Sequence, residues 1–303
     1  MRTWLIIALL SMLLSPVLSA ATSPPWNEAL IKLERWPANA GSAQVSAAFS
    51  VAPGLLATIL VKPANSDSYR AVSQAGTFAL KLLARDIDSG FSLLAPANGD
   101  TVSWPVVPID AAHPALLPGA SLTVQSSSSP MPARLAGRDL LHRSRLLESP
   151  WLRVHLPQGS WALGTPLTNP DGTLAGMLAG EVTDVTEAGR VLPAAAVAHF
   201  LKLWNQNKTL ARAVLGLKLS PAAGIPRVEE CVADLPAERN GLQPGDVLLR
   251  IGTLTVHDAA AAAEACFYLR VDEPVTITVL RGTETRDLTM TPVSAASRQP
   301  DRR

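Results

Sequence analysis

The sequence contains few of the residues that build metal sites or covalent frameworks. Its 303 residues include 2 cysteines and 5 histidines. No group of these residues has the spacing of metal ligands, so we expect neither a metal site nor a cofactor. Cys231 and Cys266 leave two interpretations open. They form a disulfide in an oxidising compartment, or they are small apolar side chains of a core.

An excess of charge of either sign is also missing. The 26 lysine and arginine residues nearly balance the 25 aspartate and glutamate residues, and the formal net charge is +1. No basic run forms the stripe that binding to nucleic acid or to an anionic membrane surface requires, which argues against both as main partners. Hydrophobic residues make up 48% of the chain, as in globular proteins, and its length suits two domains.

Beyond its first residues, the sequence has no apolar run long enough to cross a membrane. The start has the pattern of a signal peptide, with Arg2, an apolar stretch from Trp4 to Leu14, and small residues at Ser19–Ala21. We predict that residues 1–21 are a signal peptide and that the mature protein is exported, periplasmic or secreted. A membrane anchor is the less favoured alternative, because a bilayer span needs about 20 apolar residues.

Residues 22–206 are predicted to form one all-β unit. Short apolar runs are separated by Pro, Gly and Ser at close intervals, which is typical of a β-barrel or β-sandwich. The clearest runs are residues 44–51, 55–61, 78–83, 122–125 and 152–156. Apolar residues then recur at helical spacing from Val197 to Trp204, so we expect a helix over residues 194–204 at the end of this unit.

Residues 207–293 are predicted to form a smaller α+β unit, followed by a disordered tail over residues 294–303. Apolar residues and threonines alternate over 275–279, which predicts a half-buried strand, and residues 281–284 are a plausible turn into a returning strand. The alanine-rich segment 258–269 begins with an aspartate that is a candidate helix N-cap. The tail is polar and lies at a chain end, where order is usually low.

The segment Pro236–Leu248 of this second unit reads PAERNGLQPGDVL. Proline suits the first turn of a short helix, and Gly241 suits a left-handed end to it. Pro244–Asp246 predicts a tight turn into a strand over Val247–Ile251. The whole segment resembles the PAExAGLQPGDVIL stretch of bacterial PDZ domains, and the resemblance implies a PDZ fold for the second unit.

The same resemblance implies a peptide-binding site. In PDZ domains, a loop of the type xLGx holds the terminal carboxylate of a peptide through backbone N–H groups, and the peptide adds a strand to the sheet edge. The candidate peptide-binding residues are Arg212, Leu215, Gly216, Leu217 and Lys218. Arg212 has the alternative of an ordinary surface charge. The helix over 259–267 is implied as the opposite wall, where alanines leave room for a bulky apolar side chain.

Four segments of the first unit share a second resemblance. Residues 159–180 read GSWALGTPLTNPDGTLAGMLAG and resemble the GNSGGPLxNxxGxxxGI segment around a nucleophilic serine. Residues 51–58 resemble the strand before a catalytic histidine, and residues 86–94 resemble the segment of a catalytic aspartate. Residues 190–193 resemble a return strand before a closing helix. These features resemble the HtrA family, which implies a mainly β chain with a trypsin-like double β-barrel followed by the PDZ domain.

The family's chemistry is missing at the matched positions. Leu163 stands at the position of the nucleophilic serine, Val61 at that of the general base, and Gly90 at that of the orienting aspartate. None of the three side chains can attack a carbonyl, accept a proton or orient an imidazole. Trp161 replaces a glycine that shapes the oxyanion hole, and Thr165 replaces the second glycine of the motif.

The apolar replacements suggest what became of the former cleft. We expect Val61 and Leu163 to face each other, with Trp161 beside them. Apolar side chains fill such a space without leaving a buried polar group unpaired. We favour this filling over a new apolar pocket.

The resemblance therefore implies an inactive homologue of a trypsin-like serine endopeptidase that binds peptides or C-termini of exported proteins. It also implies a role as an adaptor or regulator of envelope proteolysis, with an active HtrA-type protease or further copies of the chain as candidate partners. Two alternatives stay open. One is an active HtrA-type endopeptidase that uses non-standard residues, and the other is a structural envelope protein that binds no peptide.

Overall fold

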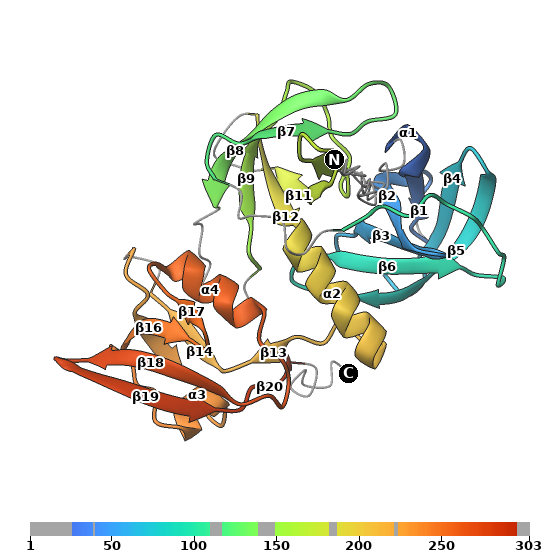
Figure 1. The fold of residues 1–303 in the computed structure, drawn as a ribbon. Helices are drawn as coiled ribbons and strands as arrows, with labels where there is room; N and C mark the ends of the chain where they lie inside the picture. The colour runs from blue at the N-terminus through green and yellow to red at the C-terminus, as the bar shows by residue number, and fades with distance from the viewer. Residues whose placement is uncertain are drawn as a thin grey trace, which may run out of the picture.

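The computed structural model describes residues 26–38, 40–109, 117–138, 149–181, 187–220 and 224–295. The predicted signal peptide and all but the first two residues of the predicted tail lie outside these ranges. The described residues form two closed β-barrels, a helix that follows them and a smaller C-terminal unit (Figure 1). Within these ranges, no helix is long and apolar enough to cross a membrane.

The first barrel closes in the order β1-β2-β3-β6-β5-β4, with every neighbouring pair antiparallel. A short helix, α1 (Trp26–Ala29), precedes it. Its strands are β1 (Leu30–Trp36), β2 (Gln44–Ala52), β3 (Leu55–Ile59), β4 (Ser68–Ser73), β5 (Gly76–Arg85) and β6 (Phe91–Pro96). Closure removes the exposed edges that an open sheet presents to other chains.

The second barrel repeats this design in the order β10-β11-β12-β9-β8-β7. Its strands are β7 (Ser121–Val124), β8 (Met131–Arg138), β9 (Leu152–His155), β10 (Pro166–Thr168), β11 (Leu174–Glu181) and β12 (Ala188–Pro193). Each of the five apolar runs in the sequence forms a strand or a large part of one, so the mainly β prediction is confirmed.

A hydrophobic cluster joins the two barrels to the helix that follows them. Helix α2 spans Ala194–Asn207, three residues beyond the predicted end. Its Phe200 is fully buried and stacks on Phe91 of β6 with ring centroids 4.8 Å apart. Met177 of β11 belongs to the same cluster. Because residues of both barrels and α2 share one core, the barrels are held as a single body.

The C-terminal unit is a small α+β structure. Strands β16, β18 and β19 with the short β17 form an antiparallel sheet, and β14 pairs with β15. Its elements are β13 (Ala213–Val214), β14 (Leu217–Leu219), β15 (Val228–Cys231), α3 (Pro236–Arg239), β16 (Val247–Ile251), β17 (Leu254–Thr255), α4 (Ala259–Phe267), β18 (Val275–Arg281), β19 (Glu284–Met290) and β20 (Val293–Ser294). The predicted N-cap is present, since Asp258 Oδ1 accepts a hydrogen bond from Ala261 N at 2.6 Å.

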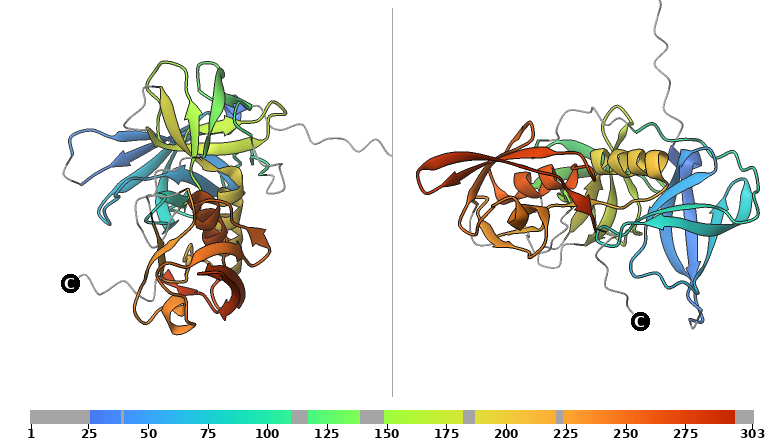
Figure 2. Two further views of the ribbon diagram at one scale, coloured as in Figure 1. Left: turned by 90° about the vertical axis from the view of Figure 1, so that its left-hand side faces the viewer. Right: turned by 90° about the horizontal axis from the view of Figure 1, so that it is seen from below.

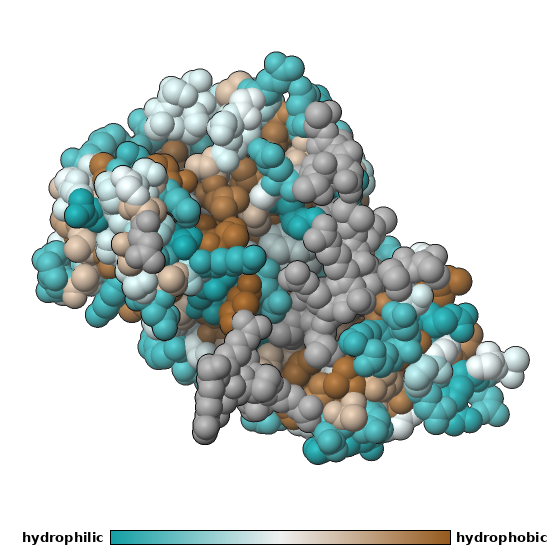
Figure 3. Space-filling model, turned by 180° about the vertical axis from the view of Figure 1, so that it is seen from behind, coloured by the Kyte–Doolittle hydropathy of each residue, from teal (hydrophilic) through white to brown (hydrophobic). Residues whose placement is uncertain are grey.

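Helix α2 marks the junction between the barrels and the C-terminal unit. In Figure 1 it begins at β12 and runs past β6 of the first barrel, after which the chain turns back through β13 into the C-terminal unit; Figure 2 shows the molecule from two further sides. The face seen in Figure 3 is largely hydrophilic, with hydrophobic patches in both halves of the molecule. Residues of both barrels, of α2 and of the C-terminal unit contact one another at this junction.

Candidate functional site

The structure brings the three positions matched to a catalytic triad, Val61, Gly90 and Leu163, to one end of the first barrel. Leu60 N donates a hydrogen bond to Gly90 O at 2.9 Å, which places the segment of Val61 beside Gly90. Ala47 N donates to Leu163 O at 2.7 Å, so Leu163 lies against strand β2 of the first barrel. Segments far apart in the sequence therefore meet as the resemblance to a protease implies.

The side chains at these positions do not fill one common space. Leu163 packs against the cluster shared by the barrels, whereas Trp161 packs against the core of the second barrel and donates from Nε1 to Pro157 O at 3.0 Å. The Val61 side chain is 52% exposed. The expected filling of the cleft by Val61 and Leu163 is therefore wrong for Val61, whose carbonyl is held by Arg35 Nη1 at 2.8 Å while its side chain meets solvent.

The turn at Gly90 has a shape that needs glycine. Its φ is +75°, in the region that L-residues rarely adopt, and an added Cβ would lie 2.8 Å from Leu60 O. Asp86, in the same turn, accepts hydrogen bonds from Ser89 N at 2.9 Å and Ser89 Oγ at 2.6 Å. A side chain at residue 90 would require the backbone to move, so the observed shape of this turn depends on glycine at that position.

The C-terminal unit presents an open strand edge. Leu217 of β14 lies opposite Cys231 of β15. The neighbouring residues Gly216 and Val232 are joined by a hydrogen bond from Val232 N to Gly216 O at 2.7 Å. Since hydrogen-bonded and non-hydrogen-bonded pairs alternate along an antiparallel ladder, Leu217 and Cys231 form a non-hydrogen-bonded pair. Leu219 lies opposite Val228 in the same way, since Ser220 N donates to Arg227 O. The N–H and C=O groups of Leu217 and Leu219 thus point away from β15. In the described part of the chain, β14 has no strand neighbour on that side.

The loop before β14 lies at the start of this edge. Gly216 has φ +84°, and an added Cβ would lie 2.2 Å from Leu235 Cβ. The carbonyl of Leu215 accepts a hydrogen bond from Ala237 N at 2.8 Å, which fixes the loop against α3. Among the described residues, the N–H groups of Leu215 and Gly216 meet no backbone acceptor. The loop therefore holds two fixed N–H groups next to an unpaired strand.

Helix α4 shares a hydrophobic core with this edge. Leu215, Leu217 and Leu219 are buried in one cluster with Ala262 and Ala265 of α4. These side chains are apolar, so the surroundings of the edge favour an apolar ligand. Lys218 lies on β14 with its Nζ 2.7 Å from Glu230 Oε2 of β15, and this ion pair is partly exposed.

A comparison with family models identifies this unit. Residues 213–291 match the model described as PDZ domain. The C-terminal unit is a PDZ domain. Leu215, Gly216, Leu217 and Lys218, selected from the sequence, lie at its open edge. A comparison with curated protein sequences gives no match.

Solved structures with the same fold cover most of the chain. The HtrA-type protease AlgW with a tripeptide has a TM-score of 0.66 at 17% identity, over 88% of this chain and 94% of that one. AlgW with a decapeptide has a TM-score of 0.62 at 18% identity, over 88% and 96% of the two chains. The serine endoprotease from Yersinia pestis has a TM-score of 0.59 at 14% identity, over 88% and 94%. The predicted fold class, a trypsin-like double barrel followed by a PDZ domain, is confirmed.

Arg212 lies at a different place from the one predicted. The residue is 3% exposed, and its Nη1 lies 3.9 Å from Oδ2 of both Asp86 and Asp88 in the first barrel. Its guanidinium carbon lies 4.6 Å from the ring centroid of Phe267. Neither a surface charge nor a group at the loop of the PDZ domain fits this position. The chain between α2 and β13 crosses the junction at this point, so Arg212 is buried between the barrel and the PDZ domain.

His199 of α2 lies in the same junction. Its ring centroid is 5.3 Å from that of Phe267 and 5.3 Å from that of Tyr268. Burial, with a smaller contribution from neighbouring cations, lowers the pKa of His199 from 6.5 to about 4. These cations are Arg212, Arg270 and Lys202. His199 is therefore neutral at pH 7 in the folded chain.

The depressed pKa of His199 makes the junction sensitive to acid. The unfolded chain takes up a proton at this histidine below about pH 6.5, whereas the folded chain resists it down to about pH 4. The contribution of neutral His199 to the unfolding free energy is therefore complete above pH 6.5 and is lost as the pH falls towards 4. We expect His199→Gln to flatten the decline in unfolding free energy over this window, measured by urea titration. His155→Gln, at an exposed position of β9, is the control and keeps the slope. Equal slopes in the two variants would contradict this assignment.

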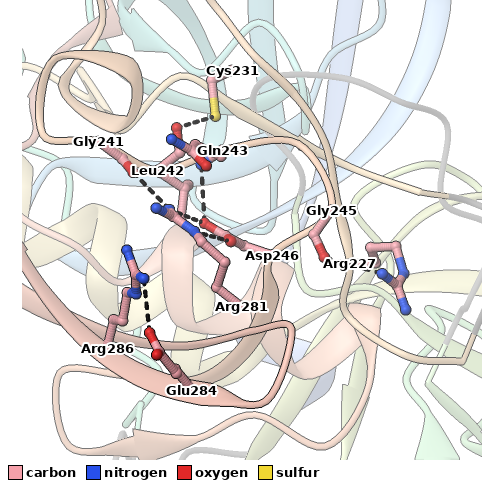
Figure 4. Close-up of polar contacts among 10 residues, drawn as sticks. All are labelled: Arg227, Cys231, Gly241, Leu242, Gln243, Gly245, Asp246, Arg281, Glu284 and Arg286. Carbon is pink, nitrogen blue, oxygen red and sulfur yellow. Dashed lines mark hydrogen bonds and ion pairs between the residues drawn. The ribbon is translucent and has the colours of Figure 1, made fainter.

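The two cysteines are free thiols. Cys231 Sγ lies 3.3 Å from Leu242 O, to which it donates, while Cys266 belongs to α4 (Figure 4 shows Cys231). Burial raises the pKa of Cys231 to about 11 and that of Cys266 to about 12. Of the two interpretations left by the sequence, the structure agrees with small side chains packed against a core, and it has no disulfide between the two residues.

The PGD turn that signalled this domain has a structural role. Asp246 is 1% exposed and accepts hydrogen bonds from Arg281 Nε at 2.7 Å and from Gln243 N at 2.9 Å (Figure 4). Arg281 Nη2 also donates to Gly241 O at 2.7 Å. Burial raises the pKa of Asp246, the hydrogen bonds from Arg281 and Gln243 lower it, and the net shift is downward. This carboxylate ties the turn to β18 and is not part of the peptide edge.

In the described part of the chain, no three potential metal ligands among His, Cys, Asp and Glu come together. The candidate functional site is the open edge of β14 with its loop. It has backbone donors, backbone acceptors and an apolar surrounding, and these are the groups that bind an extended peptide.

Proposed function

We propose that this chain is a non-catalytic protein that binds peptides or protein C-termini through its PDZ domain. The observation that carries the proposal is the unpaired edge of β14, where Leu217 and Leu219 direct their N–H and C=O groups away from β15. Unpaired backbone groups at a strand edge accept an added strand. Four of the similar solved structures contain AlgW with a peptide, which supports the same type of ligand.

The proposed binding mode uses each part of the edge differently. The peptide lies antiparallel to β14 and exchanges hydrogen bonds with Leu217 and Leu219. Its terminal carboxylate accepts hydrogen bonds from the N–H groups of Leu215 and Gly216. Its last side chain packs on the apolar cluster around Ala262. Hydrogen bonds to a charged group are the stronger kind, so the carboxylate contributes much of the selectivity for a chain end.

The barrels serve as a scaffold in this proposal. Leu163, Val61 and Gly90 supply no nucleophile, no base and no orienting carboxylate at the positions matched to a triad. We propose further that the mature protein is exported after removal of residues 1–21, and that its ligands are exported proteins. An active HtrA-type protease and a second copy of this chain are the partners proposed for the scaffold, in a role as adaptor or regulator of envelope proteolysis.

A titration with labelled peptides tests the binding function. A library of peptides with free C-termini is titrated into the full mature chain, and the best ligand is then compared with its C-terminal amide. We expect the amide to bind at least about tenfold more weakly, because a hydrogen bond to a charged group contributes roughly 1.5 to 3 kcal/mol. If no peptide binds, the structural alternative takes the place of this proposal.

The absence of catalysis is tested separately. We expect the mature chain to leave casein uncleaved and to take up no fluorophosphonate probe, because Leu163 has no hydroxyl group. Trypsin under the same conditions is the positive control. A serine of this chain labelled by the probe, located by mass spectrometry, would show that the active-enzyme alternative is correct.

A further inference from the structure

Helix α4 belongs to two hydrophobic cores at once. Ala262 and Ala265 are buried in the core of the PDZ domain, together with the leucines of β14. Phe267, the last residue of α4, is 2% exposed and belongs instead to the cluster that joins the two barrels. The helix beside the peptide edge is thus packed on the PDZ domain along its length and on the barrels at its end.

The apolar part of this contact is aromatic. The ring of Phe267 meets that of Phe200 of α2 edge to face, with centroids 5.4 Å apart. Phe200 is itself stacked on Phe91 of the first barrel. Tyr268, the C-cap of α4, packs against the same cluster. Pairs of this geometry add a directional attraction to the area they bury, so they fix the orientation of the helix end.

Two charged contacts cross the junction beside these rings. Arg212 faces Phe267 on one side and the carboxylates of Asp86 and Asp88 on the other, at 3.9 Å. Arg138 of β8 and Glu264 of α4 form an ion pair of 3.0 Å between the second barrel and the helix. Both barrels therefore hold α4, one through Arg212 and Phe267 and the other through Glu264.

We infer that the barrels are part of the peptide site, because they set the position of α4 through Phe267 and Arg212. This inference rests on the proposed peptide binding. A peptide added to β14 packs against α4, and a helix held in place before binding loses less freedom when the ligand arrives. Peptide affinity thus depends on residues of the barrels that touch no peptide. Phe267, Arg212 and Asp88 are positioning residues.

The turn of the first barrel at Gly90 holds the PDZ domain in place through Arg212. The turn of residues 86–90, matched by resemblance to the catalytic aspartate segment, supplies Asp86 and Asp88 to Arg212. Asp86 is held by Ser89 within the turn, so its carboxylate is fixed in direction. The same turn that lacks a catalytic aspartate at Gly90 therefore receives the arginine that fixes the PDZ domain.

The experiment measures peptide affinity in the full mature chain by fluorescence anisotropy. We expect Phe267→Ala to weaken binding about tenfold or more, as loss of one preorganising anchor does, and Asp88→Asn to weaken it by roughly threefold although Asp88 lies in the other domain. Phe267→Leu restores most of the affinity. Arg286→Ala is the matched control, because Arg286 of β19 pairs on the surface with Glu284 at 2.8 Å, and it leaves the affinity unchanged.

Hydrogen exchange separates positioning from folding. In Phe267→Ala and in Asp88→Asn, we expect the amides of β16 and β18 to keep their protection from exchange, while the amides of α4 exchange faster. If Phe267→Ala unfolds the PDZ domain, Asp88→Asn decides the matter, since it leaves the PDZ sequence intact. Equal affinity in the unsubstituted chain and in Asp88→Asn would overturn the inference and leave peptide binding standing. No binding by the unsubstituted chain would overturn both.

Discussion

Replacing Gly216 with alanine is expected to lower the free energy of unfolding of the PDZ domain by about 3 kcal/mol and to abolish peptide binding. Two effects add at this position. The backbone has φ +84°, which an L-residue adopts at a cost, and the new Cβ would meet Leu235 Cβ at 2.2 Å. The surrounding loop must move, and its movement displaces the N–H groups of Leu215 and Gly216.

Gly241 supplies the matched control for this substitution. It has nearly the same φ of +81°, but an added Cβ would meet nothing within 4 Å. Gly241→Ala is therefore expected to show the backbone effect alone, roughly 1 to 2 kcal/mol, with peptide binding preserved. Calorimetry of the full chain, with the two transitions resolved, measures both. If the two variants are equally stable, the contact with Leu235 has no energetic importance.

Replacing Arg35 with alanine is expected to destabilise the first barrel by about 3 to 5 kcal/mol, the usual result of breaking a buried ion pair. Arg35 Nε lies 2.6 Å from Asp67 Oδ2, and the two side chains are 11% and 1% exposed. The other guanidinium nitrogens donate to the carbonyls of Val61 at 2.8 Å and Lys62 at 3.0 Å. The substitution leaves the Asp67 carboxylate buried without its cation.

The control for this prediction is Lys32→Ala in the same strand. Lys32 Nζ lies 2.7 Å from Glu34 Oε1, a similar distance, but its side chain is 51% exposed. Exposed pairs contribute little, so we expect no measurable change in the urea midpoint. A loss of stability in Lys32→Ala as large as that in Arg35→Ala would contradict the assignment of the effect to burial.

Local patterns predicted much of the fold. The helix over residues 194–204, the N-cap at Asp258 and the strand over Val247–Ile251 all depend on residues close in sequence, and each is present. The turn at Pro244–Asp246 is also predictable, because proline, glycine and aspartate favour a tight turn through local backbone geometry. The loop of Leu215–Lys218 is predictable because it precedes the segment Pro236–Leu248, whose resemblance to PDZ domains is specific.

The contacts that join distant segments were not predictable in this way. The position of Arg212 just before the loop predicts a contact with the peptide, yet its partners Asp86 and Asp88 lie more than 100 residues earlier in the chain. No pattern in the sequence connects Arg35 to Asp67, or Asp246 to Arg281. The exposure of Val61 likewise follows from the way Arg35 holds the carbonyls of this loop.

The most direct measurement of the central claim is hydrogen–deuterium exchange of the mature chain with and without its best C-terminal peptide. The account predicts new protection at the amides of Leu215, Gly216, Leu217 and Leu219, with little change in the strands of the barrels. Protection confined to the barrels around Leu163, with β14 unchanged, would contradict it and would place the peptide between the two barrels.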